Sequence, residues 1–173
     1  MLLKDDCFVP NFKNEDKADY ALSANVSATS EQCGFEAKNV INGVARTVRD
    51  NSNMYCSNGI SEKGESITLD FGNKVNLNEL HIKFDSNLSQ EIEISMDEWV
   101  VSRQEKGLPS TLVKDYKVEL IKGGKVVKTI EKSDNIFRFN KIPLENTECD
   151  SVKITCYNTY GDKDIRIFEV RAY

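Results

Sequence analysis

This chain of 173 residues has few of the residue types that support catalysis or membrane insertion: it contains one histidine, one tryptophan and three prolines. No apolar run approaches the roughly 20 residues that cross a bilayer. Lysine and arginine number 23 against 28 aspartates and glutamates, so the net charge is -5. That balance argues against nucleic acid or an anionic membrane as the main partner, because both attract clustered positive charge.

The five cysteines form no C-x-x-C pair, which argues against a zinc knuckle or a dithiol redox motif. An odd number of cysteines in one mid-sized domain is typical of reduced thiols in a reducing compartment. A bridge between Cys33 and Cys56 is the alternative. The opening MLLKDDCFVP is too short and too acidic for a secretory signal. We therefore expect a cytoplasmic protein, with an exported parent chain as the alternative.

Apolar residues alternate with polar ones along most of the chain after the first 21 residues, and this period of two predicts short antiparallel strands. In SITLDFG, for example, Ile67, Leu69 and Phe71 share one face. Turn signals separate the segments, and Gly123-Gly124 predicts a hairpin. We expect strands in SITLDFG, ELHIKFD, DYKVELI, KVVKTI, IFRFN, VKITC and the C-terminal RIFEVRAY. Residues 1–21 are polar and irregular, and we expect an extended lead-in before a single domain at 22–173.

Two segments depart from this alternation. SMDEWVVSRQEKG begins with Ser95 and Glu98 at capping-box spacing, which predicts a short helix or an ordered loop inserted between two strands. Met96, Trp99 and Val100 would form one apolar stripe on it. We expect this stripe either to pack on its own sandwich or to dock a neighbouring domain or a second subunit. A second helical turn is expected in GFEAKNVIN. Together these elements predict an all-β jelly-roll β-sandwich of about eight strands.

Catalytic signals are weak. His81 lies mid-strand on the polar side of LHIKF, and no nucleophile is identifiable beside it, so we interpret it as a solvent-facing strand residue. The carboxylates are scattered over apparent loops and give no acid–base pair. A G-x-G-x-x-G fingerprint is absent, so this chain alone is not expected to bind FAD. The sequence therefore predicts a non-enzymatic domain.

Six segments carry a family resemblance through their order along the chain: NVSATS (25–30), AKNVINGVAR (37–46), SITLDFG (66–72), LNELHIKFDSNL (77–88), LVKDYKVEL (112–120) and RIFEVRAY (166–173). Taken together they resemble discoidin, or coagulation-factor type C, domains, which are eight-stranded jelly rolls of the galactose-binding-like class. FDSNL, LVKDY and the ending RIFEVRAY further resemble the C-terminal domain of bacterial FAD-dependent oxidoreductases. The resemblance implies a non-catalytic accessory domain that packs on a catalytic flavoprotein domain of the same chain or presents its ligand; the alternative is a carbohydrate-binding module.

The resemblance also implies a structural Ca²⁺ site, with Asn39, Asn42 and Thr47 near a turn and Glu169 as the one charged ligand. The alternative is that Glu169 pairs with Arg46 or Arg166, or caps backbone amides.

Glycan binding needs an aromatic platform and planar polar groups. The alternative is that these aromatic side chains pack on the sandwich rim or against a neighbouring domain. Arg46 is a second candidate donor beside Arg103. The candidates for ligand binding are Tyr55, Trp99, Arg103, Tyr157, Asn158 and Tyr160.

Overall fold

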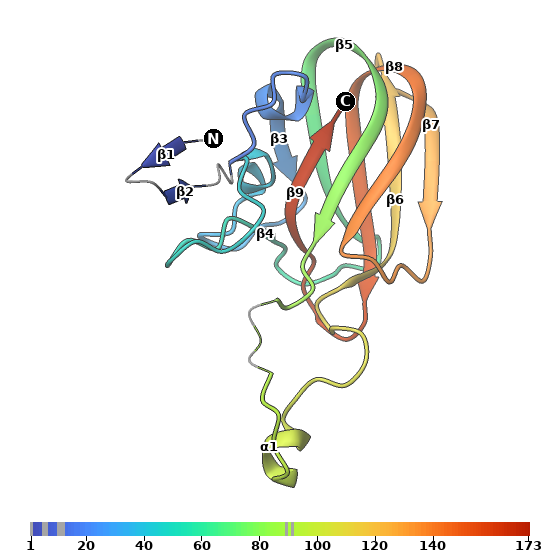
Figure 1. Cartoon of the computed structure of the whole chain (residues 1–173). Coiled ribbons are helices and arrows are strands. Elements are labelled where there is room, and N and C mark those ends of the chain that lie inside the picture. The colour runs from blue at the N-terminus through green and yellow to red at the C-terminus, as the bar shows by residue number, and fades with distance from the viewer. Residues whose placement is uncertain (1, 5–6, 10–12, 89, 91) are drawn as a thin grey trace.

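The computed structural model describes residues 2–4, 7–9, 13–88, 90 and 92–173 (Figure 1). Its secondary structure is almost entirely antiparallel β, which confirms the predicted all-β class. In the described part of the chain, no helix has the length and apolarity to cross a membrane. The elements are β1 (Leu2–Lys4), β2 (Cys7–Val9), η1 (Tyr20–Ser23), β3 (Asn25–Ala28), η2 (Ala37–Ile41), β4 (Tyr55–Cys56), β5 (Glu65–Phe84), α1 (Glu98–Ser102), β6 (Val113–Lys122), β7 (Lys125–Lys132), β8 (Phe139–Thr159) and β9 (Arg166–Ala172).

Two long bent strands, β5 and β8, connect the two layers of the sandwich. The first half of β5 pairs with β3 and with the second half of β8, whereas its second half pairs with β9 and with the first half of β8. Register shifts between Asp70 and Val75 mark the bend. The strand order is β4-β9-β5-β8-β6-β7, with β3 also on β5. The result is an open jelly-roll sandwich.

The core lies between these layers and follows from the alternation in sequence. Ile67 and Leu69 of the first half of β5 are buried, as are Leu80, Ile82 and Phe84 of its second half. They pack with alternate residues of β6, β8 and β9. Because successive side chains of a strand point to opposite faces, each strand contributes one apolar row to this core.

The segment that precedes β3 is bonded to the C-terminal strand. Asp19 is buried, and its Oδ1 accepts hydrogen bonds from the backbone N–H groups of Ala172 at 2.9 Å and Ala21 at 3.0 Å. Burial raises the pKa of this carboxyl, and those hydrogen bonds together with one from Asn14 partly offset the rise. Residues from Asn14 onward therefore contact the sandwich, although sequence placed them in a lead-in.

The segment between β5 and β6, described at residues 85–88, 90 and 92–112, projects from one end of the sandwich and carries α1 (Figure 1). We call this segment the arm and this end of the sandwich the arm end. The predicted helix forms, but Asp97 rather than Ser95 is its N-cap and accepts from Trp99 N at 2.9 Å. Met96 and Trp99 are exposed, at 103% and 65%. The apolar stripe therefore does not pack on the sandwich.

Three further details test the expectations about the IFRFN strand, the Cys33–Cys56 bridge and the second helical turn. The strand expected in IFRFN begins at Phe139, because the Asn135 side chain donates to Val113 O and Phe137 O and so holds a turn before it. Cys33 is exposed and Cys56 is buried, and neither is in a disulfide. The expected helical turn in GFEAKNVIN is present as η2.

Candidate glycan-binding site at the arm end

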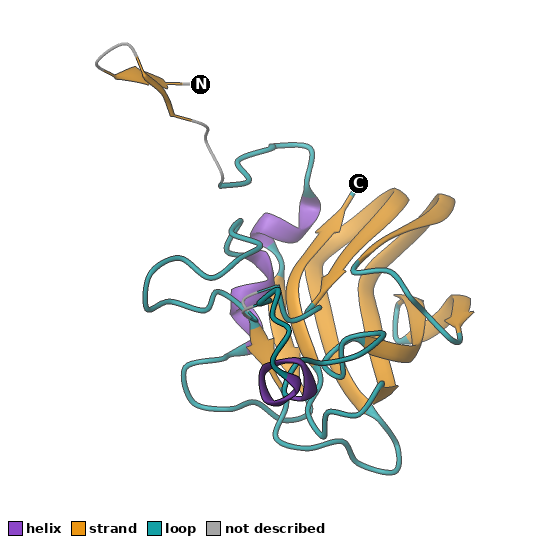
Figure 2. Ribbon diagram, turned by 60° about the horizontal axis from the view of Figure 1, so that its bottom comes forward, coloured by secondary structure: helices purple, strands orange, loops and turns teal. Residues whose placement is uncertain are grey.

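A groove of about 280 Å³ lies at the arm end, and we call it the rim groove. Strand register explains why separate segments meet there, because Phe84, Phe139 and Ile167 lie together at one end of β5, β8 and β9. Figure 2, with this end turned forward, shows loops gathered around it. The rim groove is lined by Arg46, Thr47, Asp85, Leu88, Arg138 and Phe168.

Arg138 joins two walls of the rim groove. Its Nη2 donates to Ala45 O at 3.0 Å, which ties the loop after η2 to the start of β8. Its guanidinium lies 5.4 Å from the centroid of the Phe168 ring, within cation–π range. Its buried Nε has no hydrogen-bond partner among the described residues. Leaving a buried donor without a partner is costly, and because this nitrogen is buried, a ligand in the groove would have to contact the other guanidinium nitrogens.

Asp85 supplies a buried acceptor on the opposite wall. Its Oδ1 accepts from Asn87 N at 2.9 Å, and its Oδ2 lies 3.7 Å from Arg166 Nη1. Arg166 also pairs with Asp162 at 2.8 Å, so the salt bridges connect β9 to the preceding loop. The rim groove thus combines the guanidinium of Arg138, held in place, with that of Arg46, a fixed carboxylate and an aromatic ring, and planar polar groups of this kind match pairs of neighbouring hydroxyls.

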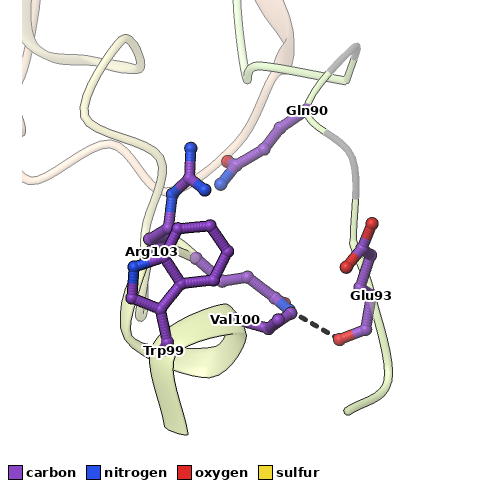
Figure 3. Close-up of a pocket in the computed structure, with 6 residues that line it drawn as sticks. Gln90, Glu93, Trp99, Val100 and Arg103 are labelled. Carbon is purple, nitrogen blue, oxygen red and sulfur yellow. Dashed lines mark hydrogen bonds between the residues drawn. The ribbon is translucent and has the colours of Figure 1, made fainter. Parts of the chain in front are cut away.

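A second hollow, of about 420 Å³, lies within the arm and is the arm hollow. Figure 3 shows Trp99 and Arg103 stacked on one side of it, with Gln90 and Glu93 across from them. Arg103 lies 4.3 Å from the Trp99 ring centroid. Gln104 Nε2 donates to Glu93 O at 2.5 Å and ties the two sides together. The structure therefore brings together two of the residues predicted to bind ligand, Trp99 and Arg103.

The other residues predicted to bind ligand lie elsewhere. Tyr55 is fully buried in the core, and its hydroxyl donates to Ser30 O at 2.9 Å. Tyr157 and Asn158 are exposed near the end of β8, where Asn158 Oδ1 accepts from Asp115 N at 3.1 Å. Tyr160 packs against the core, with Lys114 Nζ 5.9 Å from its ring centroid. Tyr55 therefore offers no surface for stacking.

Glu169, the one charged residue expected to hold calcium, already has two cationic partners. Glu169 is ion-paired with Lys83 at 2.5 Å and Arg171 at 2.8 Å, rather than with Arg46 or Arg166 as the alternative interpretation expected. Burial raises the pKa of Glu169, but the hydrogen bonds and charges of Arg171 and Lys83 outweigh burial and hold it below its ordinary value. Over the described residues, no cluster of three His, Cys, Asp or Glu side chains could hold a metal ion.

The remaining three predicted calcium ligands form side-chain hydrogen bonds near their own loop, mostly through donor groups, although Asn42 Oδ1 also accepts from Val44 N at 2.8 Å. Asn39 Nδ2 donates to Met54 O, Asn42 Nδ2 donates to Asn53 Oδ1, and Thr47 Oγ1 lies 3.5 Å from Ser52 O. With the Glu169 charge compensated by two cations, the four side chains fit a Ca²⁺ ion poorly, since this ion requires several oxygens and uncompensated negative charge.

His81 lies on the outer face of the sheet. Its Nε2 is 3.0 Å from Glu79 Oε2, and its ring contacts Phe139 at 5.4 Å and Tyr173 at 5.1 Å between centroids. Glu79 also pairs with Lys141 at 2.8 Å. These contacts connect neighbouring strands and involve no Ser or Cys side chain, but they leave the His81 side chain only 19% exposed, so it is less solvent-facing than expected from sequence.

Sequence reasoning did not identify Asp85, Arg138 and Phe168. Phe168 lies in RIFEVRAY, which was interpreted only as a regular strand, but the β5–β9 register shifts so that Lys83 pairs with Glu169 and Phe84 with Ile167. Phe168 is the extra residue of this β-bulge, and bulges redirect side chains. Alternation alone does not reveal a bulge, so only the cluster of polar and aromatic residues near strand ends could have drawn attention to these positions.

Of the comparisons with known proteins, the one with solved structures identifies the fold. Neither a protein-family model nor a curated protein sequence matches the chain. A Streptococcus pneumoniae fucose-binding module is similar over 90% of this chain and 96% of its own, with 13% identity and a TM-score of 0.66. The family 32 carbohydrate-binding module of C. perfringens NanJ, solved with galactose, matches over 89% and 96%, with 17% identity and a TM-score of 0.62. The lectin domain of lectinolysin, solved with Lewis B antigen, matches over 89% and 94%, with 14% identity and a TM-score of 0.65. At these identities the similarity establishes the fold, that of galactose-binding-like modules.

Proposed function

We propose that this domain binds glycans and that the rim groove is the binding site. The observation that carries the proposal is the combination of Arg46, Asp85, Arg138 and Phe168 in one hollow at the arm end. Arginine and aspartate side chains hydrogen-bond hydroxyl groups through planar, directional contacts. Phe168 is only 8% exposed, so the part of its ring that lines the groove can pack against sugar C–H groups, but no open face is available for stacking. The similar structures named above are themselves described as binding fucose, galactose or a Lewis antigen, which supports the same class of ligand.

The rim groove is also prepared for binding before a ligand arrives. Arg138 is held by Ala45 O and Phe168, and Asp85 is held by Asn87 N and Arg166. Little side-chain entropy is then lost when a sugar binds, and such preorganisation raises affinity. This proposal describes a binding domain with no catalytic role, in line with the character of the similar modules.

The test is a glycan array followed by isothermal titration calorimetry with galactose-, fucose- and glucosamine-containing glycans. Arg138→Lys keeps the positive charge and most of the packing but removes the planar fork of donors. We expect it to weaken binding about tenfold or more. Arg49→Lys is the matched control, because Arg49 is exposed in the same loop as Arg46 and does not line the rim groove. Equal affinities of the two variants, or no glycan bound by the wild type, would overturn the proposal.

A role in protein contact is a second candidate, because the arm exposes Ile92, Ile94 and Met96 almost completely. Exposed apolar side chains that lie close together are typical of interaction surfaces. This supports the accessory-domain interpretation in its general form. A flavoprotein domain as the partner has no support in the comparisons and stays a prediction, which the coding sequence upstream of Met1 would test.

A further inference from the structure

The rim groove continues into two further hollows along the arm. A middle hollow of about 270 Å³ shares Leu88 with the rim groove. It shares Gln90 and Gln104 with the arm hollow. The three hollows therefore follow one another from Phe168, on the sandwich, to Trp99, on the arm. A ligand seated in the rim groove could extend along this path.

The far end of the path has the chemistry of a sugar subsite. Trp99 is 65% exposed, and an exposed indole ring offers an apolar surface against which a pyranose can stack. The guanidinium of Arg103 lies against the same ring and adds donors at its border. Gln90, Glu93 and Gln104 surround the ring with amide and carboxylate groups. These groups can hydrogen-bond hydroxyls, whereas an apolar docking site would need few of them.

Polar contacts hold the base of the arm in place beside the rim groove. The Glu105 carboxylate accepts from Ser110 N and lies 3.4 Å from Asn87 Nδ2. The pKa of Glu105 is lowered, first by its hydrogen bonds with Ser110. Asn87 in turn donates its backbone N–H to Asp85 in the rim groove. One chain of contacts therefore positions the arm relative to the groove, which a multi-site ligand requires.

We infer that the ligand is an oligosaccharide, with one sugar in the rim groove and later sugars along the arm as far as Trp99. This inference rests on the proposed glycan-binding function. A single sugar would occupy only the rim groove, and the Trp99 subsite would contribute only when the glycan is long enough to reach it. Affinity should then rise with chain length, and that rise should depend on Trp99.

The experiment uses two ladders of increasing length: galactose, lactose and lacto-N-tetraose, and glucosamine with its dimer and tetramer. Calorimetry compares the wild type with Trp99→Ala, Trp99→Phe and Met96→Ala. We expect the tetrasaccharide of the recognised ladder to bind about tenfold more tightly than the monosaccharide. Trp99→Ala should abolish this gain, while Trp99→Phe should retain part of it. Met96→Ala, a fully exposed arm residue that does not line the arm hollow, should retain all of it.

Trp99 is the only tryptophan, so intrinsic fluorescence gives an independent measurement. The tetrasaccharide should shift the emission, and the monosaccharide should not. Equal affinities for monosaccharide and tetrasaccharide, or a length effect unchanged in Trp99→Ala, would overturn the inference and leave the proposed function intact. If neither ladder nor any arrayed glycan binds the wild type, the proposed function fails and the inference fails with it. Thermal melting of each variant excludes loss of fold as the cause.

Discussion

Replacing Glu169 by glutamine should destabilise the domain, because this carboxylate is buried between two cations. Its side chain is 3% exposed, and those of Lys83 and Arg171 are 24% and 25% exposed. Removing one partner of a fully buried pair costs about 3–5 kcal/mol, but water screens partly exposed partners. We therefore expect a loss of about 2 kcal/mol in the free energy of unfolding. For a domain of this size, that lowers the Tm by about 4–8 °C.

The dependence on pH separates this explanation from a simple packing loss. The pKa of Glu169 in the folded state lies below its ordinary value of 4.5. The ion pairs therefore contribute fully above pH 4.5, and their contribution is lost as the pH falls through the lower folded-state pKa. The difference in stability between wild type and Glu169→Gln should be constant from pH 6 to pH 7 and should shrink below about pH 4.5.

Urea denaturation at several pH values measures this difference. Glu145→Gln is the matched control, because Glu145 pairs with Lys128 at 2.8 Å but its side chain is 81% exposed. An exposed pair contributes about 0–1 kcal/mol, so this variant should be close to the wild type. Equal effects of the two substitutions at pH 7, or a Glu169→Gln effect that grows on acidification, would refute the ion-pair reasoning.

Three further predictions follow from particular contacts. Gly64→Ala should destabilise by about 1–3 kcal/mol in urea, because φ is +80° and a Cβ would lie 2.8 Å from Cys156 O. Gly34→Ala, with φ of +83° and open space around it, should cost less; the reverse order would contradict the argument. Millimolar Ca²⁺ should leave the Tm unchanged, since Glu169 is already paired; a rise of several degrees would show that calcium is bound. In a Cys7→Ser background, a thiol reagent should modify only the exposed Cys33 in the native protein and all four remaining thiols after unfolding. Modification of four thiols in the native protein would contradict the burial of Cys56, Cys149 and Cys156.

The fold was predictable because its signals are local. Alternation places Leu80, Ile82 and Phe84 on one face, and the Gly123-Gly124 turn joins β6 to β7 as expected. Sequence did not predict that SITLDFG and ELHIKFD belong to one bent strand. Gly72 has a φ of +71°, which is typical of a turn, and the pairing with β8 is interrupted between Asp70 and Val75 but resumes after the bend. A turn signal marks local geometry and does not show whether pairing stops there.

The site was only partly predictable because it depends on tertiary position. Trp99 and Arg103 are four residues apart on and just after α1, and this spacing brings side chains together on a helix. Tyr55 is equally aromatic, but β4 pairs with β9 and places it in the core. Arg138 and Phe168 meet because β8 and β9 both begin beside the end of β5. No local pattern encodes this contact between residues 30 positions apart.

The most direct test of glycan binding at the rim groove is a two-dimensional ¹H–¹⁵N NMR titration of the ¹⁵N-labelled protein with the tightest-binding glycan from the array. Glycan binding in the groove predicts saturable shifts for the amides of Arg46, Thr47, Asp85 and Phe168, with little change at the far end of the sandwich around Gly123. Shifts confined to the sheet faces or to the far end, with the groove amides unmoved, would contradict it.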